Sequence, residues 1–112
     1  MMKKNKNYVK FRTTKCKNDI IDLLQEYNYY DYKRNRIEIS DNSTLLVLEY
    51  RSSFKNVYQS ITIIVSGFDQ QTEVIIYESK STISPSNILC VKKEVERILK
   101  YIKEKDIEIE VI

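Results

Sequence analysis

The sequence of 112 residues contains no histidine, and it contains glycine and proline only once each. Without histidine the chain cannot form a Ser-His-Asp or Cys-His nucleophilic system, and it lacks the usual ligands of zinc and non-haem iron. A single glycine, Gly67, cannot build a Walker loop or a dinucleotide-binding fingerprint, because both need several glycines beneath the phosphates. We therefore expect no enzymatic activity, no metal and no cofactor.

Long apolar runs are also missing. No apolar stretch follows Lys3, Lys4 and Lys6, and no segment approaches the ~18 apolar residues of a membrane span. We expect a cytoplasmic protein without a signal peptide or a membrane segment. The two cysteines, Cys16 and Cys90, lie far apart and outside any CxxC motif, so in a reducing compartment we expect buried thiols.

The overall composition is typical of a globular chain, with 42% hydrophobic and 31% charged residues. The length fits a single domain, residues 1–112, in which residues 1–7 form a flexible basic N-terminus. Net charge is +3, but the chain is polarised, since ten basic and four acidic residues precede Ile37 and the remainder is acidic. Frequent Lys, Asn, Ile and Tyr favour an AT-rich coding sequence, as in a low-GC bacterium or a phage.

Hydrophobic periodicity predicts a strand and then a helix at the start of the chain. Residues 8–13 alternate between apolar and basic side chains, which is typical of an edge strand with a charged outer face. Residues 14–27 carry apolar side chains three and four positions apart, which predicts a helix with one buried face. Thr14 or Asn18 is the expected N-cap.

The middle of the chain predicts a four-stranded antiparallel meander. Alternation at residues 36–40 precedes three longer apolar stretches at residues 44–50, 57–66 and 72–79. The connections between them are short and contain Asp, Asn, Ser or Gly. Such connections favour antiparallel neighbours, because a parallel pair needs a long crossover.

A second helix and a further strand are predicted after the meander. Ser84 is the expected N-cap of the helix, and Pro85 is tolerated in its first turn. The tail 106–112 alternates once more and predicts a last edge strand. The chain is therefore expected to be an α+β protein of order β-α-β-β-β-β-α-(β), with four to six strands and two amphipathic helices. This order resembles that of the helix-grip and TATA-binding-protein-like folds, in which a curved antiparallel sheet wraps a C-terminal helix. The resemblance is one of topology only and implies no function.

Three carboxylates in the tail are the main candidates for chemistry. Asp106, Glu108 and Glu110 project from one side of the predicted strand, about 7 Å apart. That spacing suits a divalent cation or an acid and base pair. An alternative is that these charges protect an exposed sheet edge from aggregation.

The segment EYNYYDYKRNR, residues 26–36, combines four tyrosines with three basic residues. Its rings can seal the end of the first helix, because tyrosine packs its ring while its hydroxyl reaches water. Alternatively, the segment binds a partner, or stacks the bases of single-stranded nucleic acid between rings and cations. The residues expected on this partner surface are Tyr29, Tyr32, Lys33, Arg34 and Arg36.

Both faces of the predicted meander carry apolar side chains, whereas an antiparallel sheet with one wet face usually alternates cleanly. Two helices on one face leave an exposed apolar patch on the other. A helix on each face, a second copy of the chain, or a groove that holds a small apolar ligand can each cover it. We expect a non-catalytic binding or regulatory module that contacts another protein and forms a homodimer. The residues expected to mediate self-association are Leu45, Val47, Ile64, Ile75 and Tyr77.

Overall fold

The computed structural model describes residues 8–29, 31–52, 57–82 and 93–112. These residues form an α+β structure with six strands and two helices, and the predicted order of elements is confirmed. The predicted flexible segment 1–7, the predicted cap at Ser84, Pro85 and Cys90 lie outside the described residues. The elements are β1 (Tyr8–Thr13), α1 (Lys17–Gln25), β2 (Lys33–Glu38), β3 (Ser43–Ser52), β4 (Val57–Gly67), β5 (Thr72–Thr82), α2 (Lys93–Lys103) and β6 (Glu110–Val111).

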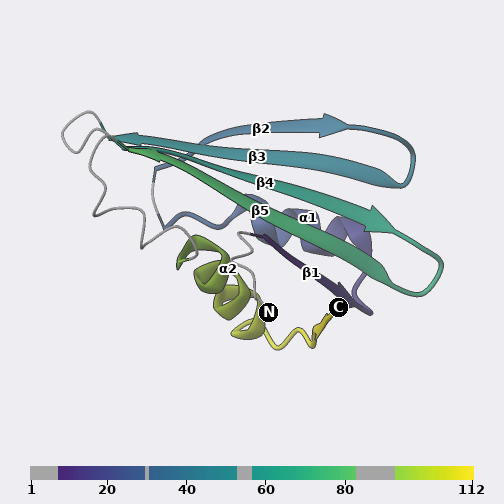
Figure 1. Cartoon of the computed structure of the whole chain (residues 1–112). Helices are drawn as coiled ribbons and strands as arrows, with labels where there is room; N and C mark the ends of the chain where they lie inside the picture. The colour runs from purple at the N-terminus through teal and green to yellow at the C-terminus, as the bar shows by residue number, and fades with distance from the viewer. Residues whose placement is uncertain (1–7, 30, 53–56, 83–92) are drawn as a thin grey trace, which may run out of the picture.

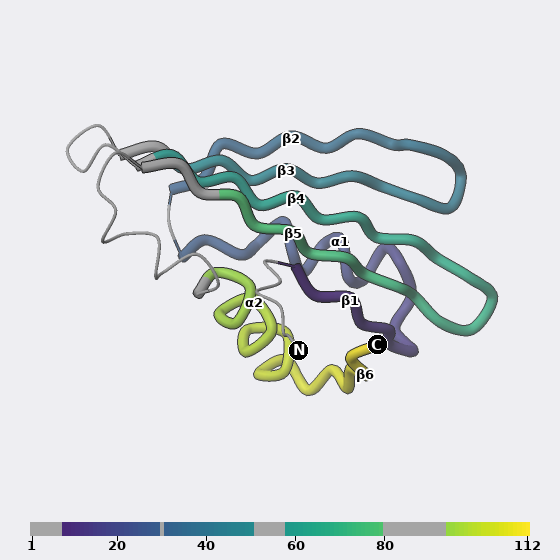
Figure 2. Tube along the Cα trace, viewed as in Figure 1, coloured from purple at the N-terminus to yellow at the C-terminus, as the bar shows by residue number. Residues whose placement is uncertain are grey.

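All six strands belong to one antiparallel sheet of order β2-β3-β4-β5-β1-β6 (Figure 1). The predicted meander is therefore present as β2 to β5. The prediction that β1 is an edge strand is wrong, because β6 pairs with its outer side at Phe11 and Arg12 (Figure 2). The alternating tail contributes only this short strand.

Both helices cover the same face of the sheet (Figure 1). The alternate residues of β1, β3, β4 and β5 that point to this face are buried, and they form one core with the apolar stripes of α1 and α2. The central side chains of this core are Phe11, Ile20, Ile21, Leu24, Leu46, Leu48, Ile61, Ile63, Val65, Val74, Ile76, Val95, Ile98 and Ile102.

The first helix is shorter than predicted at both ends, because the chain enters it from an extended residue. Cys16 is the N-cap, with φ −73° and ψ 161°, and makes no side-chain capping hydrogen bond. Thr14 precedes this position and Asn18 lies inside the first turn, so neither caps the helix as predicted. The thiol of Cys16 is exposed. The prediction of a buried thiol at Cys16 is wrong, because the residue precedes the helical stripe.

The chain leaves α2 through a left-handed residue. The N–H of Asp106 donates to the carbonyl oxygen of Lys103 at 3.1 Å, and Asp106 has φ 62°. Asp and Asn tolerate this conformation better than most residues other than glycine. Asp106 therefore closes the turn that follows the helix, and it shares no strand with Glu108 and Glu110. Among the described residues, no group of three or more potential metal ligands comes together.

Within the described part of the chain, no helix has the length and apolar character needed to cross a membrane.

Candidate functional site

The face of the sheet without helices, called the open face below, carries a row of aliphatic side chains. Leu45 on β3, Ile64 on β4 and Ile75 on β5 lie opposite one another in register. Val47 and Tyr77 lie in the next row, separated by one residue of β4. Tyr77 is 45% exposed and the other four side chains are partly buried. The structure therefore places all five residues expected to mediate self-association together on a face that neither of the two described helices covers.

Two further apolar residues extend these rows. Ile37 on β2 lies opposite Leu45 and is 53% exposed, and Tyr8 on β1 lies opposite Tyr77 and is 44% exposed. Sequence reasoning did not assign them to this face. The signal was present, since Ile37 lies in an alternating stretch and Tyr8, two residues before the outward Lys10, shares its face.

The margins of the open face are charged, and these charges pair within the chain. Lys10 lies 3.7 Å from Glu73, and Arg12 lies 3.8 Å from Glu110. On β3, the Glu49 carboxylate accepts a 2.7 Å hydrogen bond from the hydroxyl of Tyr58. The described basic and acidic side chains of this face are equal in number: Lys10, Arg12 and Lys33 against Glu49, Glu73 and Glu110. The described side chains of the face therefore form an apolar centre with a polar frame of balanced charge.

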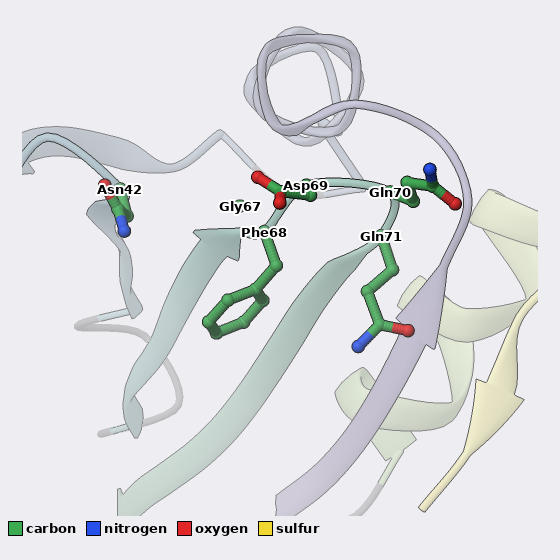
Figure 3. Close-up of a pocket in the computed structure, with 6 residues that line it drawn as sticks. All are labelled: Asn42, Gly67, Phe68, Asp69, Gln70 and Gln71. Atoms are coloured by element: carbon green, nitrogen blue, oxygen red, sulfur yellow. The ribbon is translucent and has the colours of Figure 1, made fainter.

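At one end of the sheet, the turns after β2 and β4 meet beside a shallow depression of about 770 Å³ (Figure 3). The N–H of Gly67 donates to the carbonyl oxygen of Asn42 at 2.8 Å, which ties the two turns together. A Cβ at Gly67 would lie 3.1 Å from the Cβ of Lys17, so glycine suits this close approach to α1. Phe68 is 54% exposed, and in Figure 3 its ring points away from α1. The depression surrounds this apolar ring with one carboxylate, that of Asp69, and with the amides of Asn42, Gln70 and Gln71.

The helix side of the sheet contains a buried polar cluster that sequence reasoning missed. Glu94 on α2 is 1% exposed, and one of its oxygens accepts hydrogen bonds from the hydroxyls of Tyr27 at 3.0 Å and Tyr32 at 2.6 Å. Its other oxygen forms an ion pair with Arg97. These bonds explain how a carboxylate can be buried, because each oxygen has a strong donor. The segment that precedes β2 is thereby attached to α2.

A second buried carboxylate, Glu78 on β5, lies beneath the start of the described part of α2. It accepts a 2.8 Å hydrogen bond from the amide of Gln59 and a 3.1 Å hydrogen bond from the backbone N–H of Val95. A negative charge is favourable at this end of a helix, where N–H groups lack intrahelical acceptors. Glu78 thus fixes α2 on the sheet.

Two more contacts of the tyrosines complete this region. The ring of Tyr101 meets that of Tyr27 edge-on at 5.1 Å, and its hydroxyl donates to the carbonyl oxygen of Leu23 at 2.8 Å. Burial raises the pKa of Tyr101, Glu26 raises it further, and Arg34 opposes this. The Tyr101 hydroxyl is therefore a persistent donor that links α2 to α1.

The five residues expected on a single partner surface are not brought together. Tyr32 is buried on Glu94, whereas Tyr29 is 56% exposed. Arg34 points to the helix side, donates to the carbonyl oxygen of Tyr27 and lies over the Tyr32 ring. Lys33 points to the open face, and Arg36 donates to Glu38 at 2.7 Å. The reason is that β2 begins at Lys33, so its successive side chains face opposite sides.

No protein-family model matches this chain, and no curated protein matches it in sequence.

Proposed function

We propose that this protein is a small non-catalytic binding module that acts through protein–protein contact and forms a homodimer through the open face. The observation that supports the proposal is that both helices pack on one side of the sheet, while Leu45, Ile64 and Ile75 form an apolar row on the other. A contiguous apolar surface of this kind is typical of an interaction site.

The size of the open face supports a partner with a matching flat surface. The strands from β2 to β1 are about 4.8 Å apart, and the outer strands β2 and β1 together flank residues 60–67 of β4, so the face spans about 24 by 26 Å. Two such faces bury about 1,200 Å², at the lower end of the range for stable protein interfaces. A second copy of the chain presents this same area.

The charge of the open face also favours a second copy. Its apolar centre and polar frame follow the usual anatomy of a protein interface. Because the described charges balance and pair within the chain, two copies can approach without strong repulsion. A nucleic acid, by contrast, is bound by an excess of basic side chains.

A twofold axis along β4 makes the face complementary to itself. Since β4 is the middle strand of the five from β2 to β1, such an axis places β3 of one copy over β5 of the other. Leu45 then meets the partner's Ile75, and Ile64 meets the partner's Ile64. The twist of each sheet sets the strands about 30° apart, so contact is closest at the centre.

The other two coverings have less support. Ile98 and Ile102 on α2 have no exposed surface, so side chains fill the space where a groove for an apolar ligand was expected. A helix on the open face would have to come from outside the described residues.

Light scattering after size-exclusion chromatography tests the proposal. We expect a mass of about twice 13.4 kDa for the wild type. Val47→Asp places a charge in the apolar centre, and we expect it to reduce the mass to that of one chain. The matched control is Val111→Asp, which makes the same change at a residue that is 56% exposed on β6, and it should leave the dimer intact. A wild-type mass of one chain at high protein concentration would refute the dimer.

A further inference from the structure

A second candidate surface lies on the helix side, where the segment before β2 meets α2. There a pocket of about 290 Å³ opens between Tyr29 and the outer surface of the helix. Its volume lies near the lower limit for small-molecule sites, so it suits a group of about one ring and its substituents. The pocket is lined by Tyr27, Asn28, Tyr29, Arg97, Lys100, Tyr101 and Glu104.

The wall of this pocket combines an exposed ring with cations. Tyr29 is 56% exposed. The guanidinium carbon of Arg97 lies 3.7 Å from the centre of the Tyr29 ring, and Arg97 also pairs with the buried Glu94. Arg97 therefore connects the ring to the fixed polar cluster beneath it. Because Arg97 already restrains the Tyr29 ring, the ring loses less conformational entropy when it binds a ligand.

A basic residue lies one turn further along α2. Lys100 is exposed and lines the same pocket. The described outer surface of α2 and its C-terminal turn has one more basic than acidic side chain: Arg97, Lys100, Lys103 and Lys105 against Glu96, Glu104 and Asp106. Since Arg97 is paired with Glu94, Lys100 is the cation that this pocket offers to an anion, and Glu104 lines the same pocket.

We propose that this pocket binds one nucleotide unit, with the base stacked against the Tyr29 and Arg97 pair and the phosphate held by Lys100. The amide of Asn28 offers both a donor and an acceptor to the edge of a base. Stacking on a tyrosine and neutralisation of the phosphate by lysine need no glycine-rich loop. The site differs from the aromatic and basic surface predicted from residues 26–36, because the cations beside Tyr29 come from α2 and not from β2.

The unit can belong to a free nucleotide or to a single strand of nucleic acid. Fluorescence anisotropy of a labelled oligothymidylate at low salt distinguishes the two, with thymidine monophosphate as competitor. Displacement by the mononucleotide indicates a free nucleotide, and binding of the oligonucleotide that resists this competitor indicates a strand. Either result supports the proposal. The absence of binding to both probes at low salt would overturn it.

Two pairs of variants test the location. Tyr29→Ala should weaken binding about tenfold, whereas Tyr29→Phe keeps the ring and should bind like the wild type. Lys100→Glu should weaken binding strongly, whereas Lys103→Glu makes the same charge change on the same helix outside this pocket and should have a smaller effect. Equal effects of the two lysine variants would refute the site. The site would also be refuted if polyglutamate, which carries charge without rings, displaced the labelled oligothymidylate as well as thymidine monophosphate does. The site and the open face lie on opposite sides of the sheet, so failure of one proposal leaves the other standing.

Discussion

Glu94 is the residue on which the arrangement of the tyrosine-rich segment depends. Its carboxylate receives two phenol hydroxyls and one guanidinium group, and it is buried together with the rings of Tyr27 and Tyr32. Those two rings stack with their centres 5.8 Å apart. Two of the three described tyrosines in this part of the sequence therefore stabilise the fold, and Tyr29 remains at the surface.

Removal of one hydroxyl from this cluster should measurably destabilise the protein. Tyr32→Phe removes a donor to a buried carboxylate, and hydrogen bonds to charged groups are worth about 1.5–3 kcal/mol. We expect the free energy of unfolding in urea to fall by about that amount. The matched control is Tyr77→Phe, whose ring is 45% exposed on the open face, and its change should stay within about 0.5 kcal/mol. Equal stability of the two variants would contradict the role of Glu94.

The sequence did not indicate this cluster, for a physical reason. Glu94 lies in a helix whose neighbouring residues are mostly charged, so periodicity does not distinguish it from a solvent-exposed position. Its donors Tyr27 and Tyr32 are 67 and 62 residues away along the chain. Burial that depends on such distant contacts is invisible to a local pattern. The exposed position of Cys16 is a related failure, because its place depends on where the helix begins.

At the scale of elements, the hairpin of β2 and β3 depends on one carboxylate. Glu38 at the end of β2 accepts a 2.6 Å hydrogen bond from the hydroxyl of Thr44 on β3 and a 2.7 Å bond from Arg36. The Thr44 bond, then the Arg36 bond, lower the pKa of Glu38 below its ordinary value of 4.5, although partial desolvation opposes them. The charged form is thus favoured in the folded hairpin.

This hydrogen bonding predicts a pH dependence. A carboxylate with a lowered folded pKa contributes stability that is complete above pH 4.5 and is lost as the pH falls through the lowered value. In Glu38→Gln the group does not titrate, so the stability difference from wild type should be largest near neutral pH. We expect that difference to shrink in urea titrations as the pH falls below 4.5 and through the lowered pKa of Glu38. A difference that stays constant over this range would contradict the lowered pKa.

The meander itself was predictable from its alternation and short turns, but the extent of β2 was not. Residues 33–36 are polar on both sides. They form a strand because β2 pairs with β3, from Lys33 opposite Glu49 to Glu38 opposite Thr44. A strand with no apolar face gives no periodic signal. This is also why Lys33 and Arg34 were expected on one surface and lie on opposite ones.

At the scale of the molecule, the two apolar faces of the meander could be predicted, because strict alternation fixes which residues share a face. The side on which each helix packs could not, since a helical stripe shows only that it is buried and not against which face. The structure places both helices on one side. It is this arrangement that leaves Val47, Ile64 and Ile75 on the face opposite α1 and α2.

The proposed twofold axis along β4 predicts a position-dependent crosslink. In a background with Cys16→Ser and Cys90→Ser, Ile64→Cys should form a covalent dimer with a short bis-maleimide, because residue 64 faces its own equivalent across the axis. Asn35→Cys is the control on the same face. Residue 35 lies on β2, two strands from the axis. It is therefore about 19 Å from residue 35 of the partner copy and should not react. Crosslinking of Asn35→Cys without Ile64→Cys would place the axis elsewhere.

The position of β1 has a consequence for how the chain folds as it is synthesised. The hairpins from β2 to β5 join neighbours in sequence, so they can form as soon as each has left the ribosome. Residues 8–13 emerge before the other described strands, but their longest pairing is with residues 72–77 of β5, and their other side waits for residues 110 and 111. The pairing of β1 is therefore completed last, when β6 adds to its outer side.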